Sequence, residues 1–228
     1  MKCIKLKIGL SLVSLLLSIS TWSQEDEATE ILNDVIDWQV SKLMTTASEH
    51  VKISGHPKLI DSPYGQAVYF DGIDSALFYD KAVLKNASSF TVEMIFNPDK
   101  TGEFEQRVLH IGEVSGDRML LEIRALDEEW YFDGFVKSGS HKRALIDETL
   151  THPFGNWYHV AFVVTPNTLT TFVNGKQELT EAFTFKPIQT GRTSIGVRLN
   201  ERSWFKGSIY RIKITPTIIT PNQFITYK

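Results

Sequence analysis

Apolar and polar residues alternate with a period of two over much of the chain after His50. Successive side chains of a strand point to opposite faces, so this alternation predicts strands with one buried face. Asn174-Gly175 between two such segments favours a tight hairpin turn. Together these features predict an all-β fold, an antiparallel two-sheet sandwich of the jelly-roll type. The alternating segments are 90–97, 121–124, 158–164, 169–173 and 193–199.

The segment that precedes the strands, 24–49, has a different pattern. It lacks glycine and proline, and its apolar residues recur near the spacing of one helix face. Glu25, Asp26 and Glu27 would lie in the first turn, where carboxylates suit the positive end of the helix dipole. We expect one N-terminal amphipathic helix here, which either packs on the β domain or binds a protein partner.

Residues 1–23 have the pattern of a targeting segment. Three lysines precede an apolar stretch of about a dozen residues, which is shorter than the roughly 20 residues that a spanning helix needs. We expect a secretory signal peptide cleaved after Ser23, with an uncleaved anchor as the alternative, and a secreted or periplasmic protein without a membrane span. The chain then divides into a signal peptide (1–23), an acidic helical segment (24–49) and a β domain (50–228).

Charge and cysteine content narrow the function classes. The 24 basic and 27 acidic side chains give a net charge of −3, and cleavage after Ser23 would change it to −6. The segment 24–49 carries this acidity, because the β domain holds 20 side chains of each sign. Nucleic acid is therefore not an expected partner, whereas an anionic ligand of the β domain is permitted. The single cysteine, Cys3, excludes an internal disulfide and a cysteine-based zinc site.

Three passages of the β domain resemble motifs of one family. The first is GQAVYFDGID at 65–74, the second joins WYHVAFVV at 157–164 to TFVNG at 171–175, and the third is FKGSIYRI at 205–212. They resemble an early strand and turn, the main hairpin and the closing strand of laminin-G-like, concanavalin A-like lectin/glucanase domains. The resemblance covers roughly residue 50 to the C-terminus and implies the same jelly-roll fold.

The functional implications of this resemblance are broad. Its members include carbohydrate-binding modules, lectins, adhesion domains, glycosidases and polysaccharide lyases, so the fold does not fix the activity. Many relatives use an acidic residue of the closing strand to hold calcium, and this chain has Tyr210 there. Asp71 and Asp74 supply oxygen atoms, but Ca²⁺ takes about six to eight. We expect these carboxylates to order a turn, with calcium as the alternative and no other cofactor.

Polar members of the alternating segments predict a ligand site on a solvent-facing sheet surface. The relatives bind ligands on the concave sheet and its rim loops. Sugar sites combine carboxylates and arginines, which hydrogen-bond to hydroxyl groups, with aromatic rings that stack on sugar faces. An ordinary solvated surface is the alternative. The stretch 118–147 concentrates such residues, and the predicted ligand-binding residues are Glu122, Arg124, Tyr131, Asp133, Lys137 and Arg198.

Basic residues of this stretch extend the prediction to anionic ligands. The segment 138–143, SGSHKR, reads as a flexible basic loop. With Arg124 and Lys137, its Lys142 and Arg143 would meet the carboxylate or sulfate of an acidic polysaccharide. Such charge-assisted contacts contribute about 1.5–3 kcal/mol each when partly shielded from water.

Catalysis is the competing hypothesis. A glycosidase needs two carboxyl groups at a fixed separation, and the candidates are Glu93, Glu122 and Asp133. A lyase needs a base beside a cation, and the candidates are His110, His159, Tyr131 and Lys137 as bases, with Arg124 and Arg198 as cations. Nothing in the spacing ties these residues together, and no nucleophile-elbow motif is present, so the sequence assigns no catalytic residue.

These observations predict an exported carbohydrate-binding domain, an accessory to polysaccharide capture or degradation, with an anionic polysaccharide as a ligand class. One alternative is a small polysaccharide lyase or glycosidase that uses the concave sheet. The other is a protein-interaction or adhesion module that binds its partner through the segment 24–49.

Overall fold

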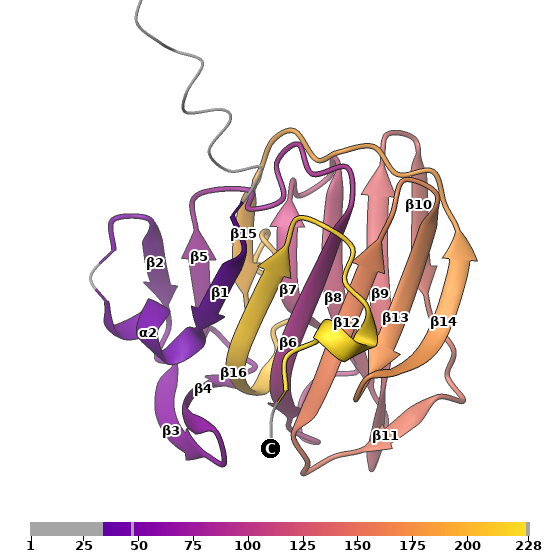
Figure 1. The fold of residues 1–228 in the computed structure, drawn as a ribbon. Coiled ribbons are helices and arrows are strands. Elements are labelled where there is room, and N and C mark those ends of the chain that lie inside the picture. Colours follow the sequence, from indigo (N-terminus) through magenta and orange to yellow (C-terminus); the bar gives the residue numbers. More distant parts are fainter. Residues whose placement is uncertain (1–33, 47, 227–228) are drawn as a thin grey trace, which may run out of the picture.

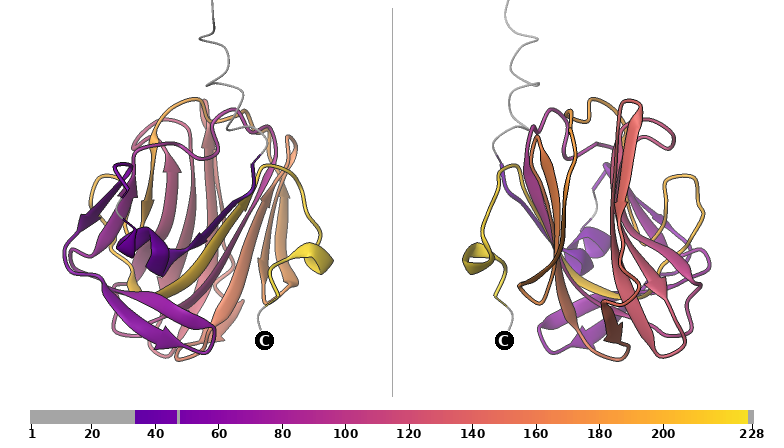
Figure 2. Two further views of the ribbon diagram at one scale, coloured as in Figure 1. Left: turned by 60° about the vertical axis from the view of Figure 1, so that its left-hand side comes forward. Right: turned by 90° about the vertical axis from the view of Figure 1, so that its right-hand side faces the viewer.

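The computed structural model describes residues 34–46 and 48–226, whose strands form two packed sheets of eight strands each. Figure 2 shows the two sheets as separate layers. Neighbouring strands within each sheet run antiparallel, from the hairpin β12–β13 to the long pair β6–β16. The predicted antiparallel two-sheet sandwich is therefore confirmed.

The first sheet has the strand order β14-β13-β12-β6-β16-β4-β3, and β1 pairs with β16 beyond the end of β4 (Figure 1). Its strands are β1 (Ile36–Gln39), β3 (Lys58–Ser62), β4 (Gly65–Asp71), β6 (Phe90–Pro98), β12 (Tyr158–Val164), β13 (Thr168–Val173), β14 (Lys176–Ala182) and β16 (Lys206–Thr215). Asn174 and Gly175 form the β13–β14 turn with positive φ angles of 50° and 76°, which confirms the predicted hairpin.

The second sheet has the order β10-β9-β8-β7-β15-β5-β2, with β11 paired to β9. Its strands are β2 (Val51–Ser54), β5 (Ala76–Tyr79), β7 (Glu105–Gly112), β8 (Arg118–Ala125), β9 (Glu129–Ser138), β10 (His141–Leu145), β11 (Thr151–Pro153) and β15 (Arg192–Ile195). Gly196, with a φ of 85°, follows β15 directly. The loop that begins there returns the chain to β16 in the first sheet.

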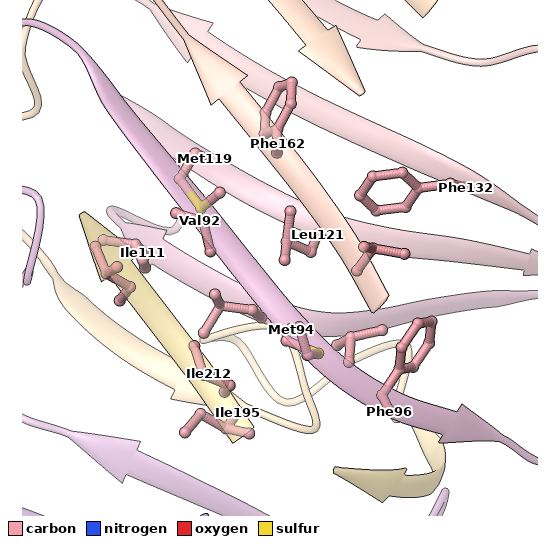
Figure 3. Close-up of a cluster of buried hydrophobic side chains, with 14 of the residues drawn as sticks. Val92, Met94, Phe96, Ile111, Met119, Leu121, Phe132, Phe162, Ile195 and Ile212 are labelled. Atoms are coloured by element: carbon pink, nitrogen blue, oxygen red, sulfur yellow. The ribbon is translucent and has the colours of Figure 1, made fainter. Parts of the chain in front are cut away.

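The hydrophobic core lies between the two sheets. Met94 and Phe96 of β6 and Met119 and Leu121 of β8 belong to one buried cluster, and none of them is more than 1% exposed (Figure 3). Every second residue of these strands thus points inward, as the alternation predicts. The intervening residues of β8 and β9 point away from the core, and they form the outer face of the second sheet.

The structure of residues 34–46 corrects the prediction of one helix over 24–48. Ile36–Gln39 is the strand β1, and the helix α2 is confined to Val40–Thr45. β1 satisfies its backbone groups on β16, and its Asp37 accepts two hydrogen bonds from Arg211. This pairing outweighs the helical spacing of the apolar residues. Val40 is fully buried, so this part of the segment packs on the β domain, whereas the predicted signal peptide and 24–33 lie outside the described residues.

The prediction of a flexible loop over 138–143 is wrong. β9 extends to Ser138 and β10 begins at His141, so only Gly139 and Ser140 form the turn. Gly139 has a φ of 59°, which a tight turn between adjacent strands requires. Lys142 and Arg143 therefore lie on an edge strand. In the part of the chain that the structure describes, no helix is long and apolar enough to span a membrane.

Candidate functional site

The outer face of the second sheet carries a groove of about 410 Å³. Its floor is the row of outward-pointing residues on β8, which begins at Arg118 and ends at Arg124. β9 pairs with β8 so that Asp133 lies opposite Glu122. We call this feature the arginine groove, and it is lined by Glu105, Arg107, Arg118, Leu120, Glu122, Arg124, Phe135, Lys142, Arg143, Ala144 and Arg198.

An ionic network of two arginines and three carboxyl groups occupies one end of the arginine groove. Nη2 of Arg124 lies 2.6 Å from Oδ2 of Asp133 and 3.2 Å from Oε2 of Glu122, and its Nη1 contacts Glu105. Arg107 approaches the same groups from β7, with Nη1 2.6 Å from Glu105 and Nε 2.9 Å from Glu122. Both guanidinium groups are thus committed to internal partners.

Glu122 and Asp133 form a buried carboxyl pair within this network. Their side chains are 2% and 0% exposed, and both carboxyl groups accept a hydrogen bond from Nη2 of Arg124. Burial, and after it the neighbouring Asp133, raise the pKa of Glu122 to about 8. Burial also raises the pKa of Asp133. Two carboxylates this close do not both ionise at neutral pH, so the pair holds a proton there.

Arg118 and Arg198 add two further positive charges to the groove. Nη1 of Arg118 donates to the carbonyl oxygen of Gly116, and Nη2 of Arg198 to that of Val114, each over 2.8 Å. Among the described residues neither guanidinium forms an ion pair, and the Nε of each is buried without a hydrogen-bond partner. Burial lowers the pKa of both arginines, and Arg198 lowers that of Arg118 further by repulsion.

Phe135 and Lys142 also line the arginine groove. The guanidinium of Arg118 lies over the ring of Phe135, 5.0 Å from its centroid. Phe135 is partly exposed on β9 and adds an aromatic surface to the groove. Lys142 adds a further positive charge from β10. The arrangement offers charge-assisted donors for an anion beside an apolar face.

The structure brings together most of the predicted ligand-binding residues. Glu122, Arg124 and Arg198 line the arginine groove, and Asp133 lies beside Glu122 in its wall. Tyr131 is buried at a position opposite Arg124. Lys137 is outside the lining, and its Nζ donates to the carbonyl oxygen of Ser115.

Sequence reasoning missed four residues of the site. Arg118 and Phe135 share the strand face of Glu122 and Asp133, so the alternation itself contained the signal for them. Glu105 and Arg107 had no such signal. A bulge between Arg107 and Leu109 shifts the register of β7, and this shift conceals which of its residues point outward.

His110, a candidate base, is fully occupied. Its Nδ1 accepts from the backbone N–H of Leu199, and its Nε2 donates to the carbonyl oxygen of Glu113. Burial lowers the pKa of His110 to about 3, so the ring is neutral. This histidine anchors the loop that carries Arg198, and its lack of a free ring nitrogen argues against general-base catalysis.

Glu93 and His159 lie on the other sheet, outside the arginine groove. His159 Nε2 lies 3.0 Å from Glu93 Oε1, which also accepts the backbone N–H of Ile225 at 2.6 Å. Phe224 packs on the His159 ring, and the short 3₁₀ helix η2 (Pro221–Gln223) lies on the same outer face (Figures 1 and 2). Both side chains are buried, so their role is to hold the C-terminal segment.

Asp71 orders a turn, as the sequence predicts. Its Oδ1 accepts from the backbone N–H groups of Ile73, Asp74 and Ser75. Within 34–46 and 48–226 no three side chains of His, Cys, Asp or Glu are grouped so as to hold a metal ion. Calcium stays an untested prediction.

Family comparison agrees with the fold. Residues 70–223 match the family model of the concanavalin A-like lectin/glucanases superfamily, and the chain belongs to this family. The match includes most of the three passages that carry the resemblance in the sequence. No curated protein matches the chain by sequence.

Solved structures share the same fold at low sequence identity. Domain 4 of AbnA, an extracellular GH43 arabinanase from Geobacillus stearothermophilus, in complex with arabinotriose, is 19% identical with a TM-score of 0.62. The alignment covers 76% of this chain and 85% of that one. The binding domain of botulinum neurotoxin DC in complex with SialylT is 9% identical, with a TM-score of 0.56 and coverages of 75% and 44%.

Proposed function

We propose that this protein is an exported carbohydrate-binding domain that takes an anionic polysaccharide or oligosaccharide in the arginine groove. The observation that carries the proposal is the pair Arg118 and Arg198, which face the groove without a carboxylate partner among the described residues. Buried polar atoms are normally hydrogen-bonded. A carboxylate or sulfate of the ligand would satisfy these donors with charge-assisted bonds.

A sugar ligand fits the rest of the groove. Phe135 supplies an aromatic surface for an apolar sugar face, and Lys142 and Glu105 supply polar groups for hydroxyls at its rim. Two neighbours of the same fold were solved with arabinotriose and with SialylT. These complexes support a carbohydrate as the ligand of this chain.

Binding is favoured over glycoside hydrolysis. The two carboxyl groups of a glycosidase lie about 5–9.5 Å apart, with substrate or water between them. Glu122 and Asp133 instead lie directly opposite each other and share one nitrogen of Arg124. A lyase would need a base with a free nitrogen or oxygen, and His110 has both ring nitrogens engaged.

Export rests on the sequence of 1–23, which has the charged, apolar and small-residue parts of a signal peptide. An exported binding domain of this kind would act as an accessory to polysaccharide capture or degradation. Mass spectrometry of the protein recovered from outside the cytoplasm should then find Gln24 as the first residue.

A glycan panel tests the binding proposal. It contains neutral arabinan, xylan and cellulose oligosaccharides and acidic oligogalacturonate, oligoalginate and chondroitin sulfate. We expect binding to at least one acidic member, and a tenfold or greater loss in Arg118→Gln and Arg198→Gln. Lys176→Gln on β14 of the other sheet removes one exposed positive charge and is the matched control. Failure of every acidic glycan to bind, or equal binding by all variants, would overturn the proposal.

A further inference from the structure

The carboxyl groups of the ionic network outnumber its arginines. Glu105, Glu122 and Asp133 face Arg107 and Arg124, so full ionisation would leave one negative charge in excess. Glu122 and Asp133 are in direct register on neighbouring strands, and both accept a hydrogen bond from Nη2 of Arg124. One proton on this pair makes the network neutral.

We infer that the Glu122–Asp133 pair is a proton-binding site whose occupancy is coupled to anion binding at Arg118 and Arg198. The inference deepens the proposed function and rests on it for the identity of the natural ligand. With the proton bound, the two free arginines act on an anion undiminished. Without it, the excess negative charge lies in the same groove and repels the anion. Bound anion must in turn favour the protonated pair, because linkage is reciprocal.

Among the described residues, no cation other than Arg107 and Arg124 forms an ion pair with Glu122 or Asp133, although Glu122 attracts Arg118 and Arg198 over a longer distance. From β7 come Glu105 and Arg107, which are already counted, and His110, which is neutral. Lys137 on β9 is turned toward Ser115. The remaining titratable or charged groups on the groove side are Arg118 and Arg124 on β8, Tyr131 on β9, Lys142 and Arg143 on β10 and Arg198 in the loop after β15.

Burial moves the pKa of Glu122 into a pH range in which binding can be measured. It raises the pKa of Glu122 to about 8, so the proton is present at neutral pH and is lost in mildly alkaline solution. Carboxylates and sulfates of a ligand stay fully ionised from pH 6.5 to 9. A change in affinity over this range therefore reports on the protein.

The experiment measures affinity for two probes, inorganic sulfate and oligogalacturonate, from pH 6.5 to 9. We expect the wild-type affinity for sulfate to fall about fivefold with rising pH, the size expected for one charge several ångströms away in a partly hydrated groove. Asp133→Asn and Glu122→Gln should remove this dependence, so that each variant binds sulfate with the same affinity at pH 6.5 and at pH 9. Asp127→Asn, an exposed carboxylate in the β8–β9 turn, should keep the dependence.

Calorimetry of the wild type tests the coupling without any variant. Titrations in two buffers of different ionisation enthalpy should show uptake of a fraction of a proton with sulfate at pH 8 and none at pH 6.5. Sulfate or oligogalacturonate binding with equal affinity across the range and no proton uptake overturns the coupling but leaves the proposed function. Coupled sulfate binding without binding of any acidic glycan overturns the proposed function but supports the coupling. Absence of all anion binding overturns both.

Discussion

The guanidinium of Arg118 lies over the aromatic ring of Phe135, 5.0 Å from its centroid. This contact holds an arginine that has no carboxylate partner among the described residues. A cation over a ring face contributes about 0.5–1 kcal/mol at a partly exposed site. We predict that Phe135→Leu, which keeps an apolar side chain but loses the ring, weakens binding of an acidic glycan by about two- to fivefold.

Titration calorimetry of the variant checks this prediction. Phe135→Tyr retains a ring face and serves as the control, with near wild-type affinity. If Phe135→Leu binds as tightly as the wild type, the ring does not position Arg118 for the ligand.

Proton binding by Glu122 should also change stability with pH. Its pKa is about 8 in the folded protein and 4.5 for the free side chain. Because the folded pKa is raised, the contribution of the protonated group is fully present below pH 4.5 and is lost as pH rises through 8. Glu122→Gln stays neutral, so its stability relative to wild type should rise by about 1 kcal/mol or more between pH 5.5 and 8.5.

Urea denaturation of both proteins at several pH values gives this difference. The expected result is two curves that diverge as pH rises. Parallel curves would show that Glu122 does not bind its proton more tightly in the folded state.

Gly196 begins the loop that carries Arg198, and the structure leaves no room for a side chain there. Its φ is 85°, and a Cβ atom would lie 2.6 Å from Cδ1 of the buried Phe70. Gly196→Ala should therefore lower the free energy of unfolding by about 2–4 kcal/mol, from crowding of the core and backbone strain together.

Gly175 is the matched control for this substitution. It has a similar φ of 76° but no atom within 4 Å of an added Cβ. Gly175→Ala should cost only the backbone strain, about 1–2 kcal/mol. Equal destabilisation of both variants, measured by urea denaturation, would contradict the packing account of Gly196.

Glu93 should fasten the C-terminal segment to the first sheet. Its carboxylate accepts from Ile225 and His159, and its side chain is fully buried. Glu93→Ala removes the acceptor of both hydrogen bonds, and each buried donor that loses its acceptor costs about 1–3 kcal/mol. Glu181→Ala, which breaks the exposed pair with Arg143, should cost at most about 1 kcal/mol.

Hydrogen exchange locates the effect of Glu93→Ala. The amide of Ile225 should exchange much faster in this variant and unchanged in Glu181→Ala. Unchanged protection of Ile225 would mean that its hydrogen bond to Glu93 is not what orders the segment.

The sandwich was predictable because alternation reports burial directly. Met94 and Leu121 have to be inside a sheet sandwich, and their polar neighbours have to be outside. The predictions failed where a local pattern competes with a distant partner. The apolar spacing around Ile36 suits a helix, but the exposed edge of β16 pairs with it as a strand.

The site was predictable only in part, because its composition depends on pairing between strands. The sequence pointed to Glu122 and Asp133 separately, whereas only the β8–β9 register places them opposite each other. Arg107 belongs to the network, and a bulge next to it disturbs the alternation of β7. A one-residue change of register reverses the face of every side chain, so such contacts do not follow from residue pattern alone.

The most direct test of the central claim compares an acidic glycan with its neutral counterpart on the wild-type protein. Oligogalacturonate is measured against its fully methyl-esterified form, and chondroitin sulfate against the desulfated, methyl-esterified chain. If Arg118 and Arg198 bind the anionic groups, neutralisation should weaken binding of the recognised glycan at least tenfold, because each charge-assisted bond contributes about 1.5–3 kcal/mol. Equal affinity for the acidic and neutral forms would contradict the account.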